Sequence, residues 1–201
     1  MALNFANNNS LSAITSLPAS ISGGDITLLE TQTASSSATI SFTSNIDSTY
    51  DVYMFKFINI HPATDNVQFQ FNGSSDSGSN YNVTKTTTFF SAYNLEDDSA
   101  RGLSYDTSKD LAQGTGFQDI SYNTGNDNDV GICGTVKLFN PSSTTFVKHF
   151  LVTMADKTEN NASGNRFIAG YFNTTSAING IQFKFGSGNI DSGVIKLYGI
   201  S

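Results

Sequence analysis

INGIQFKFGSGNIDSGVIKLYGI, residues Ile178–Ile200, is the stretch that indicates the fold class of this chain. In its first part Ile181, Phe183 and Phe185 alternate with polar residues, and from Val194 onward the side chains again follow a period of two. This period is typical of strands that bury one face. The segment between, Gly186–Gly193, is rich in Gly, Ser, Asn and Asp, which suit turns. We therefore predict a β-hairpin with an eight-residue loop, whose final strand completes a sheet.

Similar strand patterns recur along the chain about every eight to twelve residues, the spacing of sandwiches and barrels. The longest predicted strand, Tyr50–Ile60, alternates as far as Ile60 and has apolar residues on both faces, so it is expected to lie centrally. A turn at His61–Asn66 is expected to form a hairpin with Val67–Phe71, and Gly131–Phe139 is expected to pair with Thr145–Met154. Residues 100–114 show the weakest strand pattern. The other predicted strands are Asp25–Thr31, Ala38–Thr43, Asn82–Thr86, Thr88–Tyr93, Gly116–Tyr122 and Arg166–Asn173.

About ten strands with no helix of ordinary length predict an all-β fold, namely an antiparallel two-sheet sandwich of the jelly-roll kind. The pair Gly23 and Gly24 marks a hinge. We therefore divide the chain into an N-terminal extended arm, residues 1–23, and one sandwich domain, residues 24–201. The single cysteine, Cys133, is expected to be buried in its strand as a small apolar residue.

The arm is polar with scattered apolar side chains. Two interpretations remain open: the arm lies on its own domain, or it docks onto a neighbouring subunit. Large aliphatic side chains contribute roughly 1.5–3 kcal/mol each when fully covered, which favours ordering of the arm on a partner. The residues expected to make this assembly contact are Leu11, Ile14, Leu17 and Ile21.

Charge and hydropathy exclude several partners. The chain has 10 basic and 17 acidic residues, a net charge of −7, and its basic residues lie singly in the sequence, which argues against nucleic acid. No apolar segment is long enough for membrane insertion, and residues 1–10 lack the pattern of a signal peptide. Low charge with abundant Ser, Thr, Asn and Gly is typical of extracellular or virion-surface β-proteins.

The sequence gives little support for a catalytic function. Only His61 and His149 are present, one before a proline and one within a predicted strand, and structural roles are favoured for both. Asn126–Asp129 is the best candidate for a Ca²⁺ site, but it matches no EF-hand pattern and a solvated loop is favoured. We therefore expect no enzyme activity, no cofactor and no metal.

The chain has no Trp to stack on sugars, and the candidates for a weaker glycan site are Tyr93, Tyr105, Tyr122 and Tyr171.

Three segments, Phe57–Asp65, Leu138–His149 and Ala169–Asn179, resemble a family of small virion proteins of tailed bacteriophages. The family is common in marine phages and is described as structural or tail-fibre-like, and the resemblance extends over most of the chain. It implies a jelly-roll component of the virion surface, made in the host cytoplasm, with other virion proteins as partners and no catalytic motif.

The place on the particle stays open. One expectation is a tail fibre or tail-tip appendage with host-surface glycan contact, and the alternative is a capsid decoration (cement) protein on the head. A remoter alternative is a bacterial surface adhesin or carbohydrate-binding module. Viral surface proteins are commonly symmetric oligomers, so we predict a homotrimer attached to the particle by its arm. The loops Gly73–Asn80 and Asn123–Asp129 are then expected to face outward, with the contact residues Ser75, Asp76, Asn126, Asp127 and Asn128.

Overall fold

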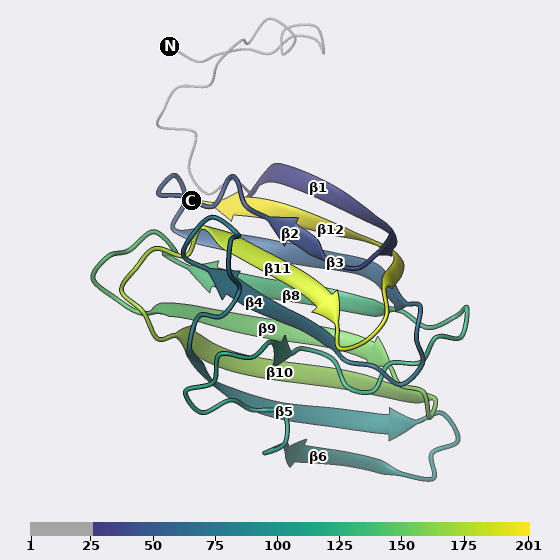
Figure 1. Cartoon of the computed structure of the whole chain (residues 1–201). Helices are drawn as coiled ribbons and strands as arrows, with labels where there is room; N and C mark the ends of the chain where they lie inside the picture. Colours follow the sequence, from purple (N-terminus) through teal and green to yellow (C-terminus); the bar gives the residue numbers. More distant parts are fainter. Residues whose placement is uncertain (1–25) are drawn as a thin grey trace, which may run out of the picture.

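The computed structural model describes residues 26–201, which form two antiparallel β-sheets (Figure 1). The all-β sandwich predicted from the sequence is confirmed, with twelve strands where about ten were expected. The arm residues Leu11, Ile14, Leu17 and Ile21 lie outside the described residues. The strands are β1 (Ile26–Ser37), β2 (Ile40–Phe42), β3 (Val52–Pro62), β4 (Phe69–Ser74), β5 (Lys85–Leu95), β6 (Arg101–Tyr105), β7 (Gln118–Asp119), β8 (Ile132–Phe139), β9 (Lys148–Lys157), β10 (Ala162–Phe172), β11 (Gly180–Phe185) and β12 (Ile190–Ile200).

The strand order is that of a jelly roll with two insertions. The larger sheet has the order β1-β12-β3-β8-β9-β10-β5-β6, and the smaller has the order β2-β11-β4-β7. The first four strands of the larger sheet, β1-β12-β3-β8, and the four strands of the smaller sheet together make the eight-stranded double Greek key of a jelly roll. The insertions β5-β6 and β9-β10 widen the larger sheet. In Figure 1 the smaller sheet lies over β12, β3 and β8, whereas β5 and β6 extend beyond it.

Two predicted hairpins are wrong in their pairing. β11 pairs with β2 and β4, whereas β12 pairs with β1 and β3, so the two C-terminal strands lie in different sheets. The same is true of β3 and β4. A period of two specifies a buried face but not a partner, and in a jelly roll both strands turn that face toward one core. The predicted pairing of β8 with β9 is confirmed.

The central position of β3 is confirmed, since it lies between β12 and β8. Its alternation was predicted to run through Ile60, and beyond Phe57 this is wrong. Asn59 has a φ of 50°, and the register shifts there on both sides. Such a bulge adds one residue to the strand, so Phe57 and Ile60 are both buried although three positions apart.

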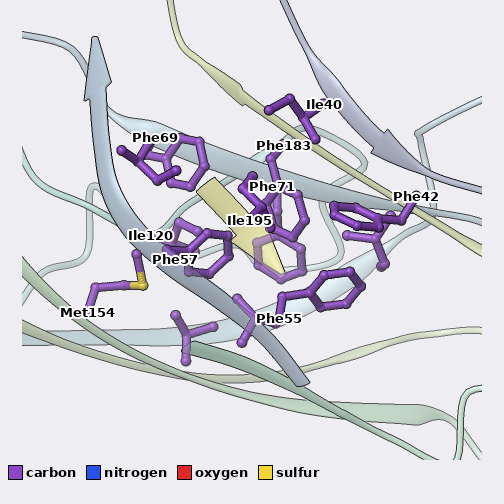
Figure 2. Close-up of a cluster of buried hydrophobic side chains, with 14 of the residues drawn as sticks. Ile40, Phe42, Phe55, Phe57, Phe69, Phe71, Ile120, Met154, Phe183 and Ile195 are labelled. Atoms are coloured by element: carbon purple, nitrogen blue, oxygen red, sulfur yellow. The ribbon is translucent and has the colours of Figure 1, made fainter. Parts of the chain in front are cut away.

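The core between the sheets is built around Phe183 of β11 (Figure 2). This ring is completely buried and contacts rings from both sheets at centroid distances of 5.0–6.3 Å. Aromatic pairs of this kind contribute about 0.5–1.5 kcal/mol each beyond the area they bury. Its aromatic neighbours are Phe42, Phe55, Phe57, Phe69 and Phe71.

One further expectation fails at the larger sheet, and a weak strand pattern there proves to be an edge strand. Cys133 is exposed, because it points to the side of β8 that the smaller sheet does not cover. Residues 101–105, within the weakest strand pattern, form the edge strand β6 against β5. An edge strand takes hydrogen bonds from one neighbour only and buries little, so its sequence is free of the usual apolar pattern.

Candidate functional site

A groove of about 490 Å³ lies on the inner face of the larger sheet, where that sheet extends beyond the smaller one. It is at the end where β5 and β9 finish, toward the right of Figure 1. Its walls come from β5, β6, β10, the β9–β10 turn and the segment after β7. The residues that shape it most are Tyr93, Ser104, Asp106, Tyr122, Glu159 and Arg166.

The floor of the groove is a buried ion pair between β9 and β10. Arg166 is 2% exposed, and its Nε and Nη2 donate hydrogen bonds of 2.8–3.1 Å to both carboxylate oxygens of Asp156. Gly164 lies directly opposite Asp156 on β10. A Cβ atom at position 164 would overlap both charged groups, so glycine is required to make room for the pair.

Tyr122 lies on this floor and is fixed from several sides. Its backbone N–H donates to Asp156 Oδ2 at 2.8 Å. The guanidinium carbon of Arg166 is 5.0 Å from the centre of its ring, and Lys109 Nζ is 5.4 Å from it, both within cation–π range. Lys109 is itself paired with Asp119 at 3.0 Å. Each cation at the floor is therefore already balanced by a carboxylate.

One wall is the ring of Tyr93 on β5. Tyr93 lies directly opposite Gly102 of β6, and a Cβ at position 102 would meet the edge of the Tyr93 ring at 2.9 Å. The ring therefore lies against the backbone of Gly102. It remains 38% exposed, so part of it is open to the groove.

The carboxyl groups of Asp106 and Glu159 also line the groove. Burial raises the pKa of Asp106, but hydrogen bonds from Ser108 outweigh it and hold the pKa below its ordinary value. Burial raises the pKa of Glu159 and the nearby charge of Asp65 acts in the same direction, whereas a hydrogen bond from the Asn123 side chain to the carboxyl group acts against them. The Oε2 atom of Glu159 is buried and has no hydrogen-bond partner among residues 26–201. A buried acceptor without a donor carries a desolvation cost that a bound hydroxyl would remove.

The tyrosines proposed for glycan contact divide between two faces. Tyr93 and Tyr122 line the groove. Tyr105 is opposite Phe90, and Tyr171 is opposite His149, on the other side of the same sheet. Within β5 and β6 this division follows from the alternation of side chains. Tyr122 is among the tyrosines that the sequence suggests, whereas the contribution of Glu159 and Arg166 has no sequence signal, because it depends on how separate segments meet.

The two loops expected to face outward lie at different ends of the sandwich. Gly73–Asn80, with Ser75 and Asp76, follows the Ser74 end of β4, whereas the segment of Asn126, Asp127 and Asn128 is anchored beside Val67, before the other end of that strand. Six strand residues span about 20 Å, so the loops lie at opposite ends of the sandwich. In the first loop, hydrogen bonds from Ser74 and Asn80 hold the pKa of Asp76 at about 2.

The candidate Ca²⁺ loop is engaged in protein contacts. Asp129 Oδ2 accepts a hydrogen bond of 2.7 Å from Lys157, and the backbone N–H of Asn126 donates to Asp65. Within the described part of the chain, no group of three or more His, Cys, Asp or Glu residues is arranged to hold a metal ion.

A second pocket, of about 560 Å³, surrounds His61 at the same end as the groove. His61 Nδ1 is 3.5 Å from Asp191 Oδ2, and Nε2 is 3.1 Å from the carbonyl oxygen of Asp127. His149 is at the start of β9, beside Tyr171 and near the opposite end of the sheet. The two histidines therefore do not share a site.

The surface of the larger sheet that points away from the smaller one, here called the outer face, carries exposed apolar side chains. Phe90 stacks on Phe167 with 5.2 Å between ring centres. Phe90 is also directly opposite Tyr105, so an aromatic row crosses three adjacent strands. Four of the large side chains here are 42–74% exposed: Phe90, Leu103, Tyr105 and Leu151.

The outer face also collects positive charge. Lys56 of β3 is directly opposite Lys196 of β12, and Lys137 of β8 is opposite Met54, two positions along from Lys56. These three lysines form no ion pair with any residue from 26 to 201. Three of the 10 basic residues, which lie singly in the sequence, are thus neighbours in the fold.

Comparisons of the chain with known protein families, with curated proteins and with solved structures find no match. Residues 26–201 contain no helix with the length and apolar character that a membrane span needs.

Proposed function

We propose that this chain is a non-enzymatic structural protein of a tailed-phage virion, exposed on the particle as a tail fibre or tail-tip appendage. The observation that carries the proposal is the outer face, where exposed large apolar side chains and lysines that are unpaired within residues 26–201 suit contact with another protein. The strand order adds support, because jelly rolls build viral capsid and lectin domains. The sequence segments that resemble tailed-phage virion proteins point the same way.

The charge on the outer face favours a ring of copies. A two-fold contact would place the same surface on both subunits, so the lysine clusters would face each other. Contact with a different, acidic surface on the next copy avoids this repulsion, and the chain has 17 acidic residues to supply it. Such head-to-tail contacts form a ring when the rotation between copies closes, and a trimer is the ring that we propose. This is the support for the homotrimer, in which the outer face of each copy is covered by its neighbour.

The position of the groove, at the end of the sandwich far from Ile26, suits an appendage. The described chain begins at Ile26, which is paired with Ile200 at one end of the sandwich. β12 runs eleven residues to the other end, roughly 35 Å away at about 3.3 Å per residue. The groove lies at that far end. A protein attached through residues 1–23 would therefore present the groove away from the particle.

The absence of enzyme activity is proposed from the arrangement of nucleophiles and bases. His61 and His149 are near opposite ends of the larger sheet, and Cys133 Sγ is on the outer face, within 3.4 Å of the backbone nitrogen and side-chain oxygen of Asn59. A cysteine or serine nucleophile needs a base within hydrogen-bond reach.

Mass spectrometry of purified particles of the phage that encodes the chain tests the proposal. We expect the protein in the particles, with a copy number on the order of tens for a fibre. A copy number on the order of hundreds would favour the alternative, a decoration protein that lies on the head through its outer face. Particles that contain no copy of the chain would refute a virion role.

A further inference from the structure

We propose that the groove between Tyr93 and Glu159 binds an uncharged saccharide. This deepens the proposed function by naming the ligand class that an appendage would contact, although the binding itself can be measured without the virion. Three properties of the groove lead to it: a partly exposed aromatic wall, a buried acceptor that lacks a donor, and cations that are all balanced.

The aromatic wall suits the apolar side of a sugar ring. Tyr93 lies against Gly102, so its ring is fixed in place, and 38% of the residue remains accessible. An amphipathic ring of this kind offers a flat apolar surface and a polar hydroxyl together. The groove volume of about 490 Å³ falls within the range of small-molecule sites.

The groove also supplies hydrogen-bond acceptors and donors for hydroxyl groups. Glu159 Oε2 is buried without a partner, and a ligand O–H is the donor that would satisfy it. Asn160, next to Glu159, and Ser104, on β6 at the Tyr93 side, also line the groove. These groups can both donate and accept hydrogen bonds, which matches a polyhydroxylated ligand.

The paired cations of the groove argue against an anionic ligand. Arg166 is held by two oxygens of Asp156, and Lys109 is paired with Asp119, so no free cation is available for an anionic sugar. An ammonium ligand could pair with the carboxyl groups of Asp106 or Glu159, so a cationic sugar is tested directly as a probe. The ring of Tyr122 already has Arg166 and Lys109 within cation–π range, which leaves Tyr93 as the one free ring face at the groove.

The floor of the groove is rigid before any ligand arrives. Gly164 makes room for the buried pair, and that pair positions both the backbone and the ring of Tyr122. A site that is already ordered loses little conformational entropy on binding, which is how a shallow groove gains useful affinity. For one or two sugar rings we expect a dissociation constant in the millimolar range.

Saturation-transfer NMR on the purified full-length protein tests the proposal with glucose, galactose, N-acetylglucosamine and rhamnose, and with their disaccharides. Glucosamine and N-acetylneuraminic acid serve as the cationic and anionic probes. The variants are Tyr93→Ala, which removes the wall, and Glu159→Gln, which keeps the shape of the acceptor side. Tyr105→Ala is the matched control, because Tyr105 is also an exposed tyrosine but lies on the outer face of the adjacent strand.

We expect saturation transfer to at least one neutral sugar, loss of that signal in Tyr93→Ala, several-fold weaker binding in Glu159→Gln, and wild-type binding in Tyr105→Ala. If no neutral sugar binds, if only the charged probes bind, or if Tyr93→Ala binds as the wild type does, the proposal is wrong. None of these outcomes bears on whether the chain is present in the virion, which the particle analysis decides separately. Thermal unfolding of each variant checks that the variant is folded, so that the loss of a binding signal is not caused by loss of the fold.

Discussion

Arg166 lies diagonally across from Asp156 on the neighbouring strand, and its guanidinium fills the space above Gly164 that any other residue would occupy. The pair is almost wholly buried and is extended by Tyr122, whose backbone donates to the same carboxylate. The geometry of this buried ion pair therefore depends on the lack of a side chain at Gly164.

Gly164→Ala is expected to displace the Arg166–Asp156 pair, because its Cβ would overlap both partners. Separating a buried pair leaves uncompensated charge and typically costs about 3–5 kcal/mol of the free energy of unfolding. Urea denaturation measures this loss. The control is Gly116→Ala, where an added Cβ meets nothing within 4 Å, and it should leave the unfolding midpoint nearly unchanged. Equal stability of the two variants would show that the sheet tolerates a side chain at 164.

Lys85 is buried at the start of β5, where its Nζ donates to Asn72 Oδ1 at 2.8 Å. Burial lowers the pKa of this ammonium from 10.5 to about 8. Between these pH values the unfolded chain holds a proton that the folded chain has released, so the free energy of unfolding rises with pH. The rise is on the order of 3 kcal/mol across the window.

Replacing Lys85→Met should remove this rise. Asn72 Oδ1 keeps a second hydrogen bond, from the backbone N–H of Gly73, so the substitution leaves no new unsatisfied acceptor there. Denaturant unfolding measured from pH 7.5 to 10 is the test. Lys184→Met, at a partly exposed position on the smaller sheet, should retain the wild-type slope. A slope that is the same in both variants would mean that Lys85 is not the group responsible.

The sequence was sufficient for the fold class, because alternation over β3, β11 and β12 reports which side of each strand is buried. It was insufficient for the pairing, since a jelly-roll crossover and a hairpin require the same alternation. The bulge at Asn59 was not predicted. The positive φ of this one residue changes the face of the sheet to which each later side chain of β3 points. The groove was out of reach for a different reason: Glu159 and Tyr122 meet only through the packing of distant segments.

Phe183→Ala is expected to destabilise the domain by about 3–5 kcal/mol, since it opens a cavity among five phenylalanine rings that have little room to collapse. Phe183→Leu keeps most of the volume and should cost clearly less. Thermal unfolding followed by circular dichroism gives the ranking. Phe183→Asp, which buries a charge with no partner, should prevent soluble folding altogether. If Phe183→Ala and Phe183→Leu were equally stable, the cluster would not be the centre of the core.

Deleting residues 1–22 is expected to leave a folded sandwich that no longer joins the particle. The deletion leaves intact all twelve strands that the structure describes, from Ile26 to Ile200. Leu11, Ile14, Leu17 and Ile21 are then absent as attachment residues. Particles assembled with the truncated protein are compared with wild-type particles by quantitative mass spectrometry. Incorporation at the normal copy number would show that attachment does not use the arm.

The homotrimer and its covered outer face can be tested together through Cys133. This thiol is exposed and lies opposite Ala155 on the outer face, so a neighbouring copy that covers the face would shield it. For the wild-type protein we expect a mass of about 65 kDa, three times the chain mass of 21.5 kDa, and slow reaction of Cys133 with a maleimide.

Phe90→Lys adds a charge to the aromatic row and should give a species of 21.5 kDa with several-fold faster labelling. Asn128→Lys adds the same charge to an exposed loop at the end of the sandwich and should behave as the wild type does. A wild-type monomer would refute the trimer, and a trimer whose Cys133 reacts as fast as in Phe90→Lys would mean that the copies meet through another surface.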